Sequence, residues 1–196
     1  MKGKIRSSRK KIFYLDSLTT TGQDGGSFKF DGYFYVATPH AYTLSANLDV
    51  KQMDIRNLDL TLQSKDEELS LQDNFEGFLD ANGMAEIVFT PDLKLDMSAT
   101  TAIFTVTINN GALINFTPLQ AAGKYLGNAD LNYVRFAKLY NRFTLMDSQI
   151  SIPLMSVEST AGQLLIEGEH GLDKKYVYLM RLPMWMVRGA TGNYLT

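Results

Sequence analysis

The chain has 196 residues, of which 45% are hydrophobic and 20% charged, and its net charge is −2. This composition excludes a disordered protein and allows one large all-β domain or two small domains with a sizeable core. Cysteine is absent, which excludes disulfides, thiol nucleophiles and cysteine-ligated zinc.

The first eleven residues carry all the charge asymmetry of the chain. They contain six basic residues and no acidic one, so that the remainder has a net charge of −8. The apolar run at 12–15 that follows is shorter than the roughly 7–15 residues of a signal-peptide core. No run approaches the ~20 apolar residues of a membrane-spanning helix. We therefore expect residues 1–24 to be a poorly defined basic tail before a single domain at 25–196. The chain is then either cytosolic or a piece of a longer exported polypeptide.

Apolar and polar residues alternate through most of the chain, which is typical of antiparallel strands with one apolar face. Phe28, Phe30, Phe34 and Val36 share one side of their segment, and Phe104, Val106 and Ile108 share one side of theirs. About ten short strands are expected, separated by turn signals. These signals are Gly25-Gly26, Thr38-Pro39-His40, Asn82-Gly83, Asn110-Gly111, Asp147-Ser148 and Gly171. Residues 64–80 are compatible with either a short helix or a loop.

One segment, 117–126, has the signals of a helix. Thr117 and Gln120 form a capping box, and Pro118 occupies the first helical position. Leu119, Ala122 and Leu126 make one apolar stripe. A helix of two to three turns is unstable alone, so we expect this stripe to dock on the apolar face of the sheet.

Candidate catalytic or metal-binding groups are few. Glu167, Glu169, His170 and Asp173 could be combined into a metal site, but His170 alternates to the face opposite the two glutamates. Neither a phosphate-binding loop, nor a nucleophile elbow, nor a dinucleotide fingerprint is present. The basic tail lacks the interleaved aromatic residues of a nucleic-acid platform. The sequence predicts neither an enzyme, nor a cofactor or metal site, nor a nucleic-acid partner.

The remaining question is what covers the apolar face of the sheet. A second sheet, a closed interior, another copy of the domain or a hydrophobic ligand would each do so. A lipid-lined groove would use Phe28, Phe30, Phe34, Val36, Phe104, Val106 and Ile108 as its lining.

From Phe104 onward the order of motifs resembles the C-terminal region of AsmA-like proteins, in the form found in Bacteroidetes-type bacteria. The matching pieces are FTVTINNGALINFTPLQAAGKYL, DLNYVRFAKLYNRFTLMDSQISIPLMSVESTAGQLLIEGEHGLD and YVYLMRLP. Upstream, LSLQDNFEGFLDANG and FTPDLKLDMSA resemble the segment that precedes this region. Together these pieces cover about 80% of the chain, and the resemblance rests on their order.

The resemblance implies a Gram-negative envelope protein, anchored in the inner membrane and extending into the periplasm. Such proteins are elongated β-sheets curled into a hydrophobic groove, and they serve phospholipid transport and outer-membrane biogenesis. Partners would be phospholipids or other acyl-chain lipids, with outer-membrane assembly proteins as further candidates. Two alternatives stay open. One is a surface or periplasmic β-sandwich that binds glycan or protein, for which Tyr33, Tyr35 and Trp185 would be suitable. The other is a small transmembrane barrel.

Overall fold

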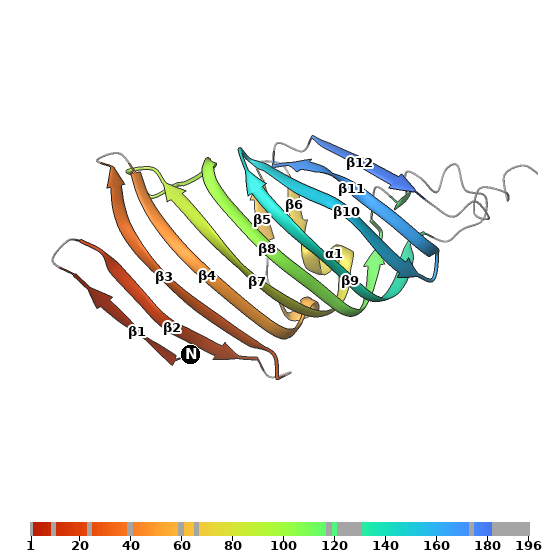
Figure 1. The fold of residues 1–196 in the computed structure, drawn as a ribbon, viewed down its shortest axis with the longest axis horizontal. Helices are drawn as coiled ribbons and strands as arrows, with labels where there is room; N and C mark the ends of the chain where they lie inside the picture. Colours follow the sequence, from red (N-terminus) through yellow and green to blue (C-terminus); the bar gives the residue numbers. More distant parts are fainter. Residues whose placement is uncertain are drawn as a thin grey trace, which may run out of the picture.

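The computed structural model describes residues 2–8, 11–22, 25–38, 41–58, 61–64, 67–116, 119–120, 131–172 and 175–181. Their main feature is one antiparallel ten-stranded sheet in the order β1-β2-β3-β4-β7-β8-β9-β10-β11-β12 (Figure 1). The strands are β1 Lys2–Ser7, β2 Phe13–Thr21, β3 Ser27–Thr38, β4 Ala41–Asp54, β7 Phe75–Phe89, β8 Leu95–Ile114, β9 Tyr133–Met146, β10 Gln149–Ser159, β11 Gly162–Gly171 and β12 Tyr176–Arg181. The sheet is open, with β1 and β12 as its edges.

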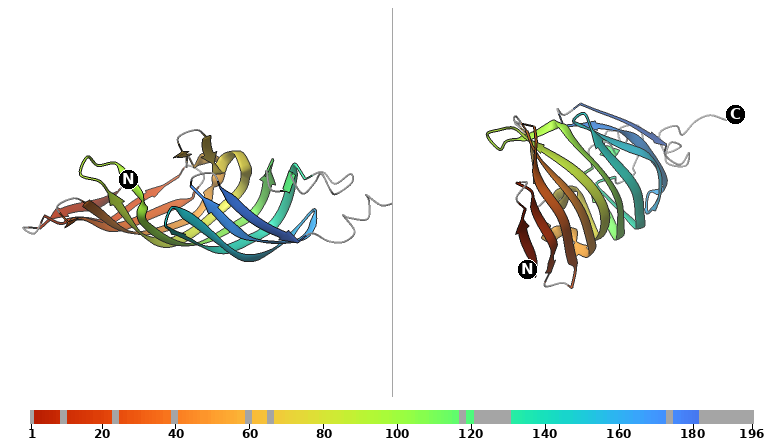
Figure 2. Two further views of the ribbon diagram at one scale, coloured as in Figure 1. Left: turned by 90° about the horizontal axis from the view of Figure 1, so that it is seen from above. Right: turned by 60° about the vertical axis from the view of Figure 1, so that its left-hand side comes forward.

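Between β4 and β7 the chain leaves the sheet. It forms a 3-10 turn, η1 (Ile55–Asn57), a two-stranded hairpin of β5 (Thr61–Ser64) and β6 (Glu67–Ser70), and one short helical turn, α1 (Leu71–Asn74). Figure 2 shows that the ten-stranded sheet is curved and that this segment lies over its concave face. The insertion is therefore a partial cover for one side of the sheet.

The expected fold class, a curved and mainly antiparallel all-β sheet with very little helix, is confirmed. Its strands form because apolar side chains alternate with polar ones and only one face needs to avoid water. The turn predicted at Asp147-Ser148 is also confirmed. Met146 pairs with Gln149, and both turn residues have positive φ angles of 52° and 60°. Such a two-residue turn matches the twist of the strands that it joins.

Residues 1–24 differ from the expected tail. Residues 2–7 and 13–21 supply β1 and β2, which pair with each other and, through β2, with β3. The basic residues obscured an alternation in which Ile5 and Leu15 pair on one face while Lys4 and Asp16 pair on the other. The N-terminal segment is thus the first hairpin of the sheet.

Two predicted turns, at Asn82-Gly83 and Asn110-Gly111, are wrong because both pairs lie inside long strands. The glycines are needed there for close approach of an aromatic ring on the neighbouring strand. Gly83 is opposite Phe104, and a Cβ at Gly83 would meet Phe104 Cδ1 at 2.5 Å. Gly111 pairs with Phe136, whose ring atoms would lie 2.6 Å from such a Cβ. The strands are also longer than expected, up to 20 residues in β8.

The glycine at position 83 should therefore be required for stability. A Cβ there would also approach the carbonyl oxygen of Ile103 at 2.2 Å, so Gly83→Ala forces a shift of backbone or of the Phe104 ring. We expect a loss of about 1–3 kcal/mol in unfolding free energy, measured by urea denaturation. The neighbouring Met84→Ala, at a site that is 61% exposed, is the control and should change the stability by less than about 0.5 kcal/mol. Equal stability of the two variants would contradict the packing role of Gly83.

Candidate functional site

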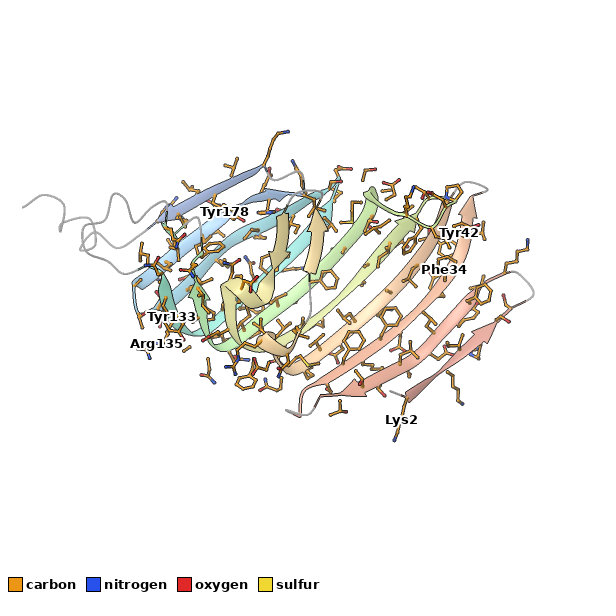
Figure 3. All side chains as sticks on the ribbon, turned by 180° about the vertical axis from the view of Figure 1, so that it is seen from behind. Lys2, Phe34, Tyr42, Tyr133, Arg135 and Tyr178 are labelled. Atoms are coloured by element: carbon orange, nitrogen blue, oxygen red, sulfur yellow. The ribbon has the colours of Figure 1, made fainter. Side chains whose placement is uncertain are left out.

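The strand registers place the seven predicted groove residues on one face of the sheet. Phe28 pairs with Val50, Val50 with Ala81 and Ala81 with Val106, so that Phe28 and Val106 share a row across four strands. Phe30 and Phe104 share the adjacent row through Leu48 and Gly83. Phe34, Val36 and Ile108 alternate onto the same side, which is the concave face. Figure 3 looks onto this face, and the insertion lies in front of it.

Charged residues occupy the opposite, convex face. Among the paired positions of the described strands, the inward set contains neither lysine, arginine, aspartate nor glutamate. On the outside, Lys29 pairs with Asp31 at 3.1 Å, and Asp80 accepts hydrogen bonds from the backbone N–H (2.9 Å) and the side-chain amide (3.0 Å) of Gln52. The sheet is thus apolar on one side and charged on the other.

One part of the concave face is closed by packing. A buried cluster runs from Val50, Met53 and Ile55 through Leu79 and Ile108 to Val134, Val157, Leu164 and Ile166. Phe116, just after β8, lies between two distant strands. Its ring centroid is 6.3 Å from that of Phe75 in β7 and 6.1 Å from that of Tyr178 in β12. The curvature thereby brings β12 back toward β7, and apolar side chains fill the space between them.

The other part of the concave face, over β2, β3, β4 and the adjoining half of β7, keeps its aromatic side chains half-exposed. Phe34 stacks on Tyr42 with ring centroids 5.7 Å apart, and Phe89 is 6.2 Å from Phe34. Further along β3 lies an open depression of about 280 Å³, lined by Leu18, Thr19, Thr20, Phe28 and Phe30.

Sequence reasoning did not include several residues of this open part among the groove residues, notably Leu18, Tyr42 and Phe89. Tyr42 pairs with Phe89 across β4 and β7, which puts both on the groove side. Leu18 was missed because its strand was assigned to the tail, although it pairs directly with Phe30. Period-2 alternation from Phe34 would reach Tyr42 and Phe89 through their strand partners, whereas the register shift between Leu15 and Leu18 hides Leu18 from it.

Polar side chains are few on the concave face, and two of them have clear partners. Asn141 is buried, and its side-chain amide donates a hydrogen bond of 2.7 Å to the carbonyl of Pro153, at an irregularity in β10. Nδ1 of His170 lies 2.9 Å from the hydroxyl of Tyr178. Burial lowers the pKa of His170 below its usual value, which favours a neutral imidazole. These groups support the sheet and do not form a charged site.

The arrangement considered for a metal site does not come together. Glu169 pairs with the exposed Val177 on the convex side, while His170 faces Tyr178 on the concave side. Asp173 lies outside the described residues. Among the residues that the structure describes, no cluster of three or more potential metal ligands occurs. Within the same residues, no helix has the length and apolar character needed to cross a membrane.

The predicted helix at 117–126 can be followed at two positions. Leu119 and Gln120 are helical, and the backbone N–H of each donates to the carbonyl of Phe116, at 2.9 Å and 3.0 Å. Leu119 is fully buried in the core cluster, whereas Gln120 is exposed. Thr117, Pro118, Ala122 and Leu126 lie outside the described residues.

The insertion starts at a charged contact. Asp54, the last residue of β4, accepts hydrogen bonds from the backbone N–H of Arg56 (3.0 Å) and from its guanidinium (2.7 Å). Asp54 is only 8% exposed. The Arg56 guanidinium lowers the pKa of the Asp54 carboxyl below its usual value, because it stabilises the charged form. Asp54 thereby caps the 3-10 turn η1, with which the insertion begins.

Comparisons with known proteins give no further assignment. A scan against protein-family models and searches of the curated proteins and of the solved structures each returned no match for this chain.

Leu119 should be a main contributor to the closed part of the concave face. Leu119→Ala removes a fully buried side chain and should lower the free energy of unfolding by about 2–5 kcal/mol in chemical denaturation. Gln120→Ala, at the next residue, removes an exposed amide and its 3.0 Å hydrogen bond to Asn132, with an expected loss of about 1 kcal/mol or less. A smaller loss for Leu119→Ala than for Gln120→Ala would contradict the docking.

The Asp54–Arg56 contact should make stability depend on pH. Because the folded state lowers the pKa of Asp54, its contribution is present at neutral pH and is lost as the pH falls through the folded pKa. Asp54→Asn should therefore lower the melting temperature at pH 7 and flatten its decrease on acidification. Lys94→Gln, which removes an exposed ion pair with Asp92, is the control and should change neither value measurably. Parallel acid profiles for Asp54→Asn and wild type would exclude this role.

Proposed function

We propose that the concave face binds the acyl chains of lipids and that the protein serves phospholipid transport between membranes or outer-membrane biogenesis. A single observation carries the proposal. The concave face has no charged residue among its paired strand positions, and the insertion and the buried cluster cover only a part of it. Monomeric soluble proteins rarely leave a contiguous apolar face of this kind uncovered unless it has a ligand or partner.

The binding would be passive. Acyl chains would lie along Phe28, Phe30 and Phe34 and continue toward Phe104, while the polar headgroups stay in water at the open side of the curved sheet. Burial of each methylene group would contribute about 0.8 kcal/mol. Because this interaction is not directional, a lipid could move along the face without a large barrier at any one position. No residue would have a catalytic role in this mechanism.

The resemblance to AsmA-like proteins supports the same class of ligand and suggests a cellular setting. In that setting the chain would be the periplasmic part of an inner-membrane-anchored envelope protein, and its partners would be phospholipids and outer-membrane assembly proteins. The alternating sheet and the groove-side aromatics are the features of this chain that such a role would use.

The test is whether the purified protein carries lipid. Organic-solvent extraction followed by mass spectrometry should detect phospholipid or another acyl lipid bound to the wild type. Phe34→Asp puts a charge on the groove side beside the rings of Tyr42 and Phe89 and should reduce the bound lipid about tenfold or more.

Tyr33→Asp provides a matched control. Tyr33 is adjacent in the same strand, is 41% exposed and faces the convex side, where its ring lies 5.5 Å from that of Tyr35. This variant should carry the wild-type amount of lipid. A wild-type protein that is folded and free of lipid after extraction would overturn the proposal, as would equal losses in the two variants.

A further inference from the structure

The two edges of the ten-stranded sheet carry the most exposed large apolar side chains of the described residues. Val177, in β12, is 74% exposed and Ile5, in β1, is 71% exposed. Leu179, also in β12, is 53% exposed. Figure 1 shows these strands at opposite ends of the sheet. An edge strand with apolar residues and unpaired backbone groups can accept another strand.

The lengths and directions of the two edge strands fit each other. β1 and β12 each have six residues. Every neighbouring pair in the sheet is antiparallel, so with ten strands β1 and β12 run in opposite directions. If a second copy is placed in the same orientation, its β1 therefore meets β12 of the first copy antiparallel. The concave faces of the two copies then lie on the same side.

The charges of the two edges are also complementary. On the convex face β1 presents Lys2, Lys4 and Arg6, because Lys4 pairs with Asp16 and the Arg6 guanidinium lies 5.1 Å from the ring centre of Tyr14. On the convex side of β11, next to β12, stand Glu167 and Glu169. Two strand spacings separate β11 from an added β1, about 9.6 Å. The stem of Lys2 or Lys4 covers most of that distance over Val177 and Leu179, and the glutamate side chains extend toward its charge from β11.

We propose that this chain associates with further copies of itself head to tail, with β12 of one copy pairing with β1 of the next. Val177 and Leu179 are then covered by the basic side chains of the neighbouring β1, and Ile5 of the neighbour lies on the concave side. The contact uses two different edges, so it is heterologous and continues beyond a dimer. Each added copy lengthens the apolar concave face by ten strands. This assembly does not depend on whether the face binds lipid.

Two registers of β1 against β12 keep the concave faces of the two copies on the same side. Full overlap sets Lys4 opposite Leu179 but also puts Lys2 opposite Arg181, and like charges in that position are unfavourable. A shift of two residues sets Lys4 opposite Val177 and replaces this pair with Arg6 opposite Lys175, where the charge of Arg6 is already paired with Asp16 of its own copy. The shifted register is the favoured one.

Sedimentation velocity tests the association and its charge dependence. The wild type should form species larger than dimers as its concentration rises. Val177→Lys puts a positive charge against the basic strand of the next copy and should weaken association about tenfold or more, whereas Val177→Glu should retain it. Met84→Lys, the same type of change at a 61% exposed site inside β7, should behave as wild type. A wild type that is monomeric up to about 1 mM would overturn the proposal, as would equal effects of Val177→Lys and Val177→Glu.

Cysteine cross-linking tests the geometry, and the chain has no cysteine of its own. Residues directly opposite in an antiparallel pair have Cα atoms about 4.5–5.5 Å apart, within the range of a disulfide. Under oxidation, the double variant Lys4→Cys/Val177→Cys should give a ladder of covalent multimers if the shifted register forms. Lys4→Cys/Leu179→Cys should give the ladder if the strands overlap fully. Each single variant should give at most traces of dimer. Efficient dimers from a single variant would show a symmetric edge contact and overturn the head-to-tail arrangement, as would the absence of a ladder from both double variants.

Discussion

The confinement of the charged strand residues to the convex face is the constraint on which the rest of the structure depends. Period-2 alternation over ten adjacent strands produces a large apolar surface, and every part of it must be covered or bound. The insertion between β4 and β7 and the segment around Phe116 and Leu119 cover the part over β7 to β12. Over β2 to β4 the rings remain half-exposed, and this difference within one face gives the molecule its candidate site.

Curvature explains why a short cover is sufficient for half of the sheet. A flat sheet of ten strands would need a second layer of similar area, about 10 Å away. Because the sheet bends, the ring centroid of Tyr178 in β12 lies 6.1 Å from that of Phe116. The far edge of the sheet therefore contributes to the cover of its own concave face. Glycines opposite aromatic rings, as at Gly83 and Phe104, fit this bending because the ring lies directly over the neighbouring backbone.

Sequence reasoning predicted the fold class and the shared side of the aromatic residues, because alternation is a local property of each strand. It misplaced Asn82-Gly83 and Asn110-Gly111 because the turn signal of these dipeptides is also local, whereas the rings that require the glycines come from another strand. It likewise separated residues 1–24 from the sheet because six positive charges hid the alternation of Ile5 and Leu15. Which part of the apolar face is covered depends on the insertion and the curvature, and neither has a signature in a single strand.

The order of the strands in space follows their order along the chain, with one interruption at the insertion after Asp54. Most neighbouring strands are joined by short connections, so each new strand can pair with the one made just before it at a small loop-closure cost. The exceptions are the pairing of β4 with β7, which must close a loop of 20 residues from Ile55 to Asn74, and that of β8 with β9, which must close one of 18 residues at 115–132. These two junctions set the most non-local steps in the assembly of the sheet, and the rate of folding should depend on them more than on any hairpin.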